Sequence, residues 1–305
     1  MEIKKTRFAD LLETALKAAI EAGTAVLEIY GSDDFEIECK DDDSPVTRAD
    51  RRAHDIIDAC LQRTGLPLIS EEGADIPFSE RRAWEKYWLV DPLDGTREFI
   101  KRNGEFTVNI ALMDRPAEKQ PHVPAAGVVY VPVKDILYIG YTVISGHPAG
   151  GAWRIENAAA GGTIESLAGA LARGIPLPVN GSNGSDGPRF TAIVSRSHNT
   201  PESEELLAIL EAEYGTVQRI SSGSSIKFCL VAEGTADIYP RFHRTMEWDT
   251  AAGDAVCRAA GCRVTEKDAS TDLRYNKPEL HNPWFIVMGP RVDSSLLSRG
   301  GYIPE

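Results

Sequence analysis

Two aspartates three residues apart, Asp91 and Asp94, lie in a segment whose residue types suit the binding of a metal ion. They directly follow the apolar run of residues 88–90, which we interpret as a short buried strand, and the proline and glycine around them predict a sharp bend. Mg²⁺ prefers oxygen ligands in a near-octahedral arrangement. The two carboxylates and the carbonyl of Leu93 can supply several of these ligands from one tight turn.

The residues after this pair indicate where a phosphate group would bind. Gly95 and Thr96 can leave backbone N–H groups free beside the metal ligands, and such groups bind phosphate oxygens. An ordinary acidic turn is the alternative, and an Asp-Gly pair alone would favour it. The coincidence of a strand, two acids, a proline and a Gly-Thr pair in the segment 91–96 favours a metal and phosphate site instead.

Further acidic ligands must come from other segments. Two-metal phosphoryl chemistry requires carboxylates on both sides of a bridging oxygen, with the cations roughly 3.5 to 4 Å apart. Glu71 follows a predicted strand at residues 67–70, in the same kind of position as Asp91, so neighbouring strands would bring the two together; a solvated surface glutamate is the alternative. Asp249 begins a predicted helix, where it could be the N-cap, a metal ligand or both.

A second group of residues could bind an additional anion. The serine-rich segment 221–225, which includes Ser224, precedes a predicted helix that contains Lys227, and free amides beside an ammonium group would suit a phosphate. Ordinary serine capping explains the same pattern. Arg241 at the end of a predicted strand and His198 could contact the same phosphate or a base; a surface arginine and a structural histidine are the alternatives.

The elements that must position these residues follow from apolar periodicity. The first thirty residues are typical of an amphipathic helix. We predict further helices over residues 46–61, 202–214, 226–233 and 251–260, and strands over residues 67–70, 88–90, 107–113, 126–131, 136–141, 190–195, 216–220 and 236–239. The pattern predicts an α/β fold class, with an antiparallel sheet and helices (α+β) in the N-terminal half and α/β layers in the C-terminal half.

The organisation along the chain predicts two domains. Residues 1–145 would form an α+β domain with most of the metal ligands, and residues 146–305 an α/β domain with Asp249 and the residues that recognise the substrate. Residues 145–188 are rich in Gly, Ala, Ser and Asn, which is typical of a domain connection with a flexible excursion.

The composition of the chain limits the classes of binding partner and the cellular compartment that we expect. The chain has 305 residues and a net charge of -13, which argues against electrostatic binding to nucleic acid or to an anionic membrane. We expect no transmembrane segment. Five cysteines without a Cys-x-x-Cys pair favour buried thiols and a reducing cytoplasm. Loose attachment to the inner membrane surface and the oligomeric state stay open.

Three separated motifs resemble the signatures of the lithium-sensitive, Mg²⁺-dependent phosphatase superfamily that includes the inositol monophosphatases. In chain order they are Ser70-Glu71-Glu72-Gly73, Asp91-Pro92-Leu93-Asp94-Gly95-Thr96 and Trp248-Asp249-Thr250-Ala251-Ala252-Gly253. Residues 98–110 and 239–242 resemble the bacterial 3'(2'),5'-bisphosphate nucleotidase branch. The resemblance spans most of the chain and implies the layered αβαβα sandwich of the superfamily.

The resemblance implies a set of metal ligands. Glu71, Asp91 and the Leu93 carbonyl would hold one Mg²⁺, while Asp91, Asp94 and Asp249 would hold a second, with Asp91 as the bridge. Whether two or three cations bind during turnover stays open.

The resemblance also implies the catalytic groups. The amides of Gly95 and Thr96 would receive the phosphate, and the Thr96 hydroxyl with Asp50 would orient the attacking water and help to deprotonate it, beside Glu71. From the residues alone Asp50 has another explanation, because residues 47–50 match a helix capping box.

Three functions fit these observations. The resemblance favours hydrolysis of adenosine 3',5'-bisphosphate to AMP and phosphate, with cleavage of 3'-phosphoadenosine 5'-phosphosulfate left open. An inositol or sugar phosphatase with the same metal chemistry is the second, and a non-catalytic interaction module is the third. The presence of every expected metal ligand and the acidic composition disfavour the interaction module. The expected partner is therefore a small nucleoside bisphosphate.

Overall fold

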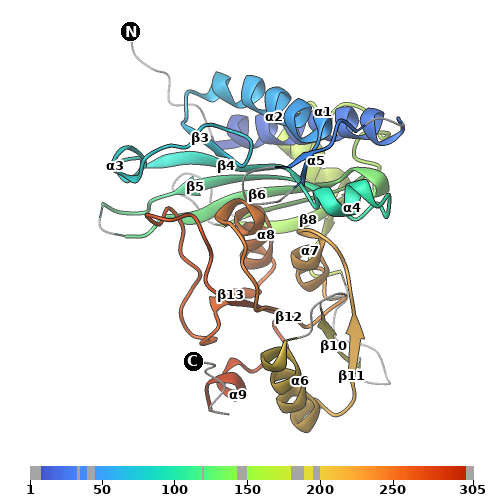
Figure 1. The fold of residues 1–305 in the computed structure, drawn as a ribbon, viewed down its shortest axis with the longest axis vertical. Coiled ribbons are helices and arrows are strands. Elements are labelled where there is room, and N and C mark those ends of the chain that lie inside the picture. Colours follow the sequence, from blue (N-terminus) through green and yellow to red (C-terminus); the bar gives the residue numbers. More distant parts are fainter. Residues whose placement is uncertain are drawn as a thin grey trace.

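The computed structural model describes residues 8–32, 35–39, 45–118, 120–142, 150–179, 189–194 and 200–299, and these form two large sheets and one two-stranded sheet (Figure 1). The larger sheet contains, in spatial order, β3 (Leu68–Ser70), β4 (Lys86–Asp94), β5 (Thr107–Asp114), β6 (Val123–Val131), β7 (Ile136–Tyr141), β8 (Gly151–Glu156) and β9 (Ile175–Pro176). The smaller contains β11 (Val217–Ile220), β10 (Phe190–Ile193), β12 (Ile238–Arg241), β14 (Phe285–Met288) and β13 (Arg263–Glu266). A separate hairpin pairs β1 (Glu38–Cys39) with β2 (Pro45–Val46).

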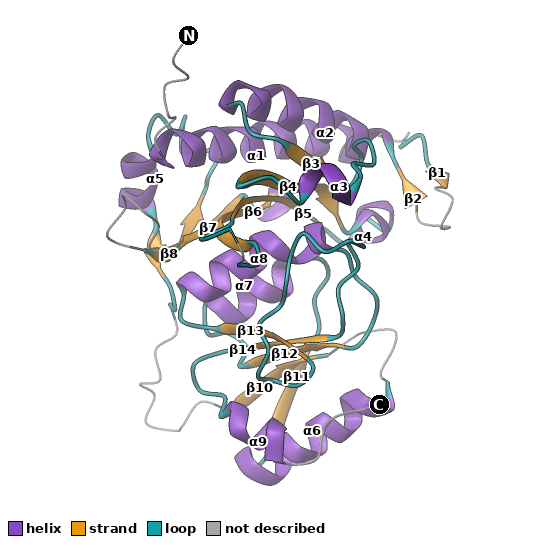
Figure 2. Cartoon of the chain, turned by 90° about the vertical axis from the view of Figure 1, so that its left-hand side faces the viewer, coloured by secondary structure: helices purple, strands orange, loops and turns teal. Residues whose placement is uncertain are grey.

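The helices separate the sheets and cover them, which gives five layers (Figure 2). The outer layer on the large sheet consists of α1 (Phe8–Tyr30), α2 (Arg48–Leu61) and α5 (Leu167–Arg173). Between the sheets lie α7 (Ile226–Ala232) and α8 (Glu247–Ala259), and beyond the small sheet lie α6 (Pro201–Tyr214) and α9 (Ser294–Arg299). Two short helices, α3 (Phe78–Arg81) and α4 (Thr96–Ile100), flank β4 in the chain. The predicted α/β class and αβαβα sandwich are confirmed.

Helix α1 shows how the apolar pattern produces the outer layer. Leu12, Leu16 and Val26 are spaced so that they fall on one side of a helix, and all three are buried against the large sheet. Burial of each such side chain contributes roughly 1.5 to 3 kcal/mol. None of the helices in the described ranges has the length and apolar content that a bilayer crossing requires.

Helix α8 packs directly on the large sheet because two strand residues under it lack side chains. A Cβ atom at Gly127 on β6 would lie 2.3 Å from the Ala252 carbonyl oxygen, and one at Gly140 on β7 would lie 2.5 Å from the Cα of Val256. These close approaches set the depth of α8 between the sheets. The helix carries Asp249, so the packing also sets the position of that carboxylate.

Several predicted boundaries were wrong. The helix predicted over residues 46–61 begins at Arg48, because Val46 pairs in β2 and Thr47 caps the helix. The strand predicted over residues 236–239 begins at Ile238, since the Ala236 amide still bonds to the end of α7.

The connection predicted over residues 145–188 is also corrected where the structure describes it. Strand β8 pairs with β7 along its whole length, β9 pairs with β8, and α5 packs on the same sheet. The Gly- and Ala-rich composition hid these elements because it carries little periodic signal. The division of the chain into domains 1–145 and 146–305 stays a prediction.

Candidate active site

Two adjacent strands bring Glu71 and Asp91 together, as predicted. Strands β3 and β4 run parallel with Ser70 opposite Val90, and the Glu71 amide donates to the Val90 carbonyl at 3.1 Å. Glu71, the residue after β3, therefore lies beside Asp91, the residue after Val90 in β4. Every other neighbouring pair in the large sheet is antiparallel, so this site depends on its one parallel contact.

Asp91 and Asp94 lie within the irregular end of β4 and not beyond it, which corrects the predicted strand end at residue 90. The pairing with β5 shifts register between these two residues. A bulge of this kind redirects side chains at a strand end. The Leu93 amide donates to Asp91 Oδ1 at 3.1 Å and closes the turn. Gly95 follows with a φ of 97°, a left-handed conformation that favours glycine.

Asp249 reaches the same place from α8. It is the third residue of the helix and not its N-cap, which is Met246. Asp249 Oδ2 accepts a hydrogen bond from the Met246 amide at 2.9 Å, so one oxygen caps the helix and the other is available for a ligand. The helix therefore begins four residues earlier than the predicted range of 251–260.

Burial and acidic neighbours raise the pKa of two of the site carboxylates, Asp91 and Asp249. Burial raises the pKa of Asp91 well above its ordinary value, and the negative charges of Glu71, Asp94 and Asp249 raise it further. Burial and the charge of Asp94 raise the pKa of Asp249 to about 8. Asp91 is only 1% exposed. The charged groups with the largest influence on Asp91 are thus all acidic, and nothing among them neutralises it.

This donor set fits a hard divalent cation. Carboxylate oxygens and a backbone carbonyl are the ligands that Mg²⁺ prefers, and no soft ligand stands among them. In the described part of the chain no three Asp, Glu, His or Cys side chains are grouped closely enough to hold a metal ion as they stand.

Asp50 caps α2, and it also contacts Thr96, the residue with which the resemblance implies a catalytic role. Its Oδ2 accepts hydrogen bonds from the Thr47 amide at 2.7 Å and the Thr47 hydroxyl at 2.6 Å, which forms the capping box of α2. Its Oδ1 accepts the Thr96 hydroxyl at 2.9 Å. Burial raises the pKa of Asp50, while the hydrogen bonds from Thr47 and Thr96 lower it. The contact that the resemblance implied between Thr96 and Asp50 is therefore present.

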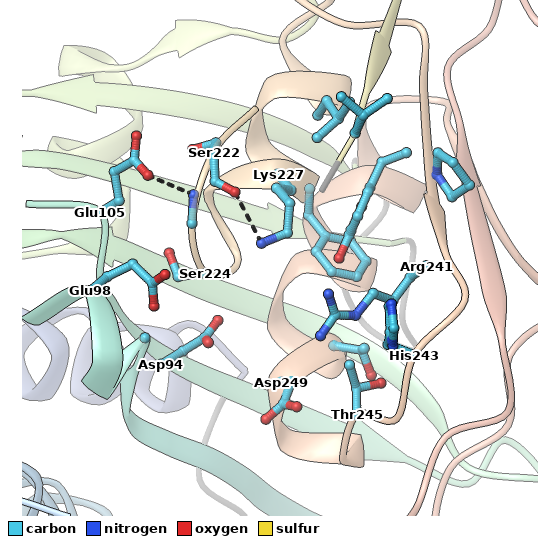
Figure 3. Close-up of a pocket in the computed structure, with 18 of the residues that line it drawn as sticks. Asp94, Glu98, Glu105, Ser222, Ser224, Lys227, Arg241, His243, Thr245 and Asp249 are labelled. Carbon is cyan, nitrogen blue, oxygen red and sulfur yellow. Dashed lines mark hydrogen bonds between the residues drawn. The ribbon is translucent and has the colours of Figure 1, made fainter. Parts of the chain in front are cut away.

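A cavity of about 320 Å³ begins at Asp94 and Asp249 and extends between the layers. Figure 3 shows that Asp94, Asp249, Lys227 and Arg241 face this common space. Gly95 and Ser224 also line it. Gly95, Ser224, Lys227 and Arg241 thus share one cavity with two of the predicted metal ligands, whereas Thr96 is not among the lining residues. His198 lies outside the described residues.

The ammonium group of Lys227 loses its proton at a lower pH than that of an ordinary lysine. Its Nζ lies 3.4 Å from the Ser222 carbonyl oxygen and 5.6 Å from the centre of the Tyr239 ring. Burial of the ammonium group lowers the Lys227 pKa to about 8, and the positive charge of Arg241 adds to this effect although Asp94 opposes it. An anion between Lys227 and Arg241 would stabilise both charges.

Sequence reasoning missed the groups that orient Asp94. The Ser225 hydroxyl lies 2.7 Å from Asp94 Oδ2 and 2.8 Å from the carbonyl oxygen of Asp249, and Asn109 Nδ2 lies 3.3 Å from the same Asp94 oxygen. Both residues are buried. Asn109 gave a usable signal, because an amide inside the apolar run 107–113 needs a polar partner.

The acidic rim of the cavity was missed as well. Glu98 and Glu105 line it, and Glu105 Oε2 accepts a hydrogen bond from the Gly223 amide at 2.9 Å. This bond joins the segment after α4 to the serine-rich segment before α7 (Figure 3). Only the fold brings these two segments together.

Comparison with known proteins identifies relatives over nearly the whole chain. Residues 8–293 match the sequence profile of the inositol monophosphatase family. Proteins named 3'(2'),5'-bisphosphate nucleotidase CysQ from Salmonella typhimurium and Escherichia coli strain K12 are each 43% identical over 282 residues, which cover 91% of this chain and 99% of theirs.

Solved structures agree with these matches. The crystal structure of CysQ from Bacteroides thetaiotaomicron, a bacterial member of the inositol monophosphatase family, is 46% identical and has a TM-score of 0.80, covering 93% of this chain and 99% of that one. An inositol monophosphatase from Anabaena is 22% identical with a TM-score of 0.64 over 96% of both chains, which shows a shared fold.

Proposed function

Because the chain belongs to the inositol monophosphatase family, we propose that it is a Mg²⁺-dependent 3'(2'),5'-bisphosphate nucleotidase. It would hydrolyse adenosine 3',5'-bisphosphate to AMP and phosphate. The observation that carries this proposal is the identity of 43% over 91% of the chain with relatives of that name. The acidic cluster beside a cavity with two cationic side chains supports it.

The residues that would hold the metal ions are those gathered at the end of β4. Glu71, Asp91 and the Leu93 carbonyl form one set, and Asp91, Asp94 and Asp249 form the other. When bound, the cations would lower the pKa of the attacking water, neutralise the phosphoryl oxygens and stabilise the leaving oxygen.

Thr96 and Asp50 would orient the attacking water and accept its proton. Since the Thr96 hydroxyl donates to Asp50 at 2.9 Å, its lone pairs are left to accept a hydrogen bond from water. The water oxygen would form a bond to phosphorus while Asp50 accepts the water's proton through Thr96. The ester P–O bond would break, and the leaving oxygen would take a proton from solvent to become the hydroxyl of AMP. The Gly95 and Thr96 amides would hold the phosphoryl oxygens.

The rest of the cavity would select a substrate with a second phosphate. Lys227 and Arg241 face the space beyond the carboxylates, and Ser224 borders it. A nucleoside bisphosphate carries a second anion some distance from the scissile one, whereas a monophosphate leaves these cations without a partner. We also propose a cytoplasmic location, because all five cysteines are free thiols.

A substrate panel tests the function. Purified protein is incubated with adenosine 3',5'-bisphosphate, inositol 1-phosphate or fructose 1,6-bisphosphate, with Mg²⁺ or with EDTA, and phosphate release is measured. We expect the highest kcat/KM for adenosine 3',5'-bisphosphate and no release with EDTA. A higher kcat/KM for inositol 1-phosphate would support metal-dependent hydrolysis but would reject adenosine 3',5'-bisphosphate as the preferred substrate. Absence of Mg²⁺-dependent release from all three would reject the enzyme.

A further inference from the structure

A buried carboxylate that the proposed chemistry does not use begins α8, two residues before Asp249. Glu247 is 0% exposed. Its Oε2 accepts the Asn276 amide at 2.7 Å, and its Oε1 accepts the Lys277 amide at 3.1 Å and Lys277 Nζ at 2.5 Å. The first turn of α8 is thereby bound to the loop at residues 274–278 through three hydrogen bonds to one side chain.

A buried arginine binds the other side of the same loop. Arg81 is 3% exposed and ends α3, in the segment that leaves the sheet at Glu71. Its guanidinium donates to the carbonyl oxygens of Lys277 and Pro278, each at 2.6 Å, and to that of Ile76 at 3.2 Å. The positive charge is therefore satisfied mainly by backbone carbonyls of the loop.

Asn276 joins the two halves of this network. Its Oδ1 accepts Arg81 Nη1 at 2.7 Å and its Nδ2 donates to the Arg81 carbonyl at 3.0 Å, while its backbone amide binds Glu247. It has a φ of 58°, a left-handed conformation that asparagine tolerates better than most residues. The residue is thus suited to the position in both its backbone and its side chain.

We propose that Glu247, Asn276 and Arg81 are positioning residues that fix Asp249 relative to the segment beginning at Glu71. The proposal rests on the metal-dependent function proposed above. Asp249 lies in α8 and Glu71 follows β3, and this network is a polar link between the stretches that carry them. Loss of the link would let the first turn of α8 shift, and the cation would bind less tightly.

The chemistry of the network favours this role over simple packing. Buried ionic groups rarely stabilise a fold more than well-packed apolar groups of similar volume would. Directional hydrogen bonds, in contrast, restrict the position of a helix end more strongly than apolar contacts do. Mutation of residues that orient metal ligands without binding the metal themselves typically changes the metal affinity by about 10- to 100-fold.

Glu247→Gln tests the proposal, with Asp254→Asn as a matched control. The new amide group would face the donors of Lys277 or Asn276 and weaken the network at unchanged volume. Asp254 is also 0% exposed on α8 and binds the same loop, where it accepts the Tyr275 hydroxyl at 2.8 Å and pairs with Arg258. The charged groups that influence it are Arg258 and Asp272, not the four site carboxylates.

Mg²⁺ binding to the purified proteins is measured by calorimetry, below the unfolding temperature of every variant. We expect Glu247→Gln to bind Mg²⁺ about 10-fold more weakly than wild type, and Asp254→Asn to bind within twofold of it although both lower the melting temperature. Turnover by Glu247→Gln should recover at saturating Mg²⁺. Arg81→Lys keeps the charge but loses the fork of donors, and we expect a smaller loss of affinity in the same direction.

The outcomes separate this inference from the proposed function. Wild-type Mg²⁺ affinity in both Glu247→Gln and Arg81→Lys would overturn the positioning role alone. An equal loss of affinity in Asp254→Asn would also overturn it, because general loosening of α8 would then explain the effect. If wild-type protein binds no Mg²⁺, the proposed function fails and this inference fails with it.

Discussion

At the scale of single residues, Asp91 is a buried carboxylate surrounded by other acids of the candidate site. It is 1% exposed, and Glu71, Asp94 and Asp249 all act on it with negative charge. A fold retains such an arrangement at the expense of stability, which is typical of sites that bind a cation or perform chemistry.

Asp91→Asn should abolish phosphate release while the protein stays folded. Asparagine keeps the size and can still accept the Leu93 amide, but it removes the shared ligand and one of four repelling charges. An upward pKa shift on folding means that the ionised Asp91 destabilises the folded state at pH 7, so the metal-free variant should gain free energy of unfolding. Denaturant titration at pH 7 without metal measures this. Substantial turnover in the variant would refute the role of Asp91.

The pH dependence of substrate capture should report on Lys227. Its pKa of about 8 lies below the ordinary lysine value, because burial disfavours the charged form. The ammonium is therefore present below pH 8 and lost above it. We expect kcat/KM for adenosine 3',5'-bisphosphate to fall by up to about tenfold per pH unit above pH 8.

Lys227→Arg provides the control for this pH profile. Arginine stays charged throughout the range, so the fall above pH 8 should disappear in that variant. A wild-type profile that is flat to pH 9.5, or an equal fall in the arginine variant, would exclude Lys227 from binding the second phosphate.

At the scale of elements, helix α8 both carries a residue of the candidate site and packs in the core between the two large sheets. It lies between the sheets, carries Asp249 in its first turn, and rests on β6 and β7 where glycines allow close approach. The position of one proposed metal ligand thus depends on strand residues that lie far from it in the chain.

Gly127→Ala should therefore lower both stability and activity. The added methyl would lie 2.3 Å from the Ala252 carbonyl oxygen, so α8 must move away from the sheet. Overpacking of this kind costs typically about 1 to 3 kcal/mol, and the displaced Asp249 should reduce kcat/KM for the bisphosphate. Gly31→Ala, where the methyl meets nothing closer than the Leu27 carbonyl oxygen at 3.5 Å, should change neither quantity. Unchanged activity in Gly127→Ala would show that Asp249 does not depend on this packing.

At the scale of the whole molecule, the layers place acidic and basic groups around one cavity. The chain has a net charge of -13, yet Lys227 and Arg241 both face the space next to Asp94 and Asp249. These two cationic groups would allow a highly charged anion to approach an acidic protein, provided that cations cover the carboxylates.

Mg²⁺ should stabilise the whole fold. A ligand that binds only the folded state at 100 times its Kd adds about 2.7 kcal/mol, so we expect the melting temperature to rise by several degrees on addition of Mg²⁺ and to fall back with EDTA. Differential scanning fluorimetry measures the shift. The shift should vanish in Asp91→Asn. A wild-type melting temperature that is insensitive to Mg²⁺ would contradict metal binding by this site.

The sequence by itself determined the chemistry of the donors and most of the local elements. The order of residues in the chain gives the carboxylates of Asp91 and Asp94, their spacing and the following Gly-Thr pair. The apolar periodicity of α1 is strong enough to identify a helix without knowledge of the elements that it packs against. The contact between Thr96 and Asp50 came from family resemblance, since their separation of 46 positions carries no local signal.

Only the tertiary structure decided how these groups meet. The parallel register of β3 and β4, the hydrogen bonds from Ser225 and Asn109 to Asp94, and the network around Arg81 all join segments that are distant in the chain. Such contacts depend on which surfaces are buried together when all the layers pack, and no short stretch of sequence contains that information. The residue types therefore determine which groups the site can bind, and long-range packing determines the position of each side chain in the site.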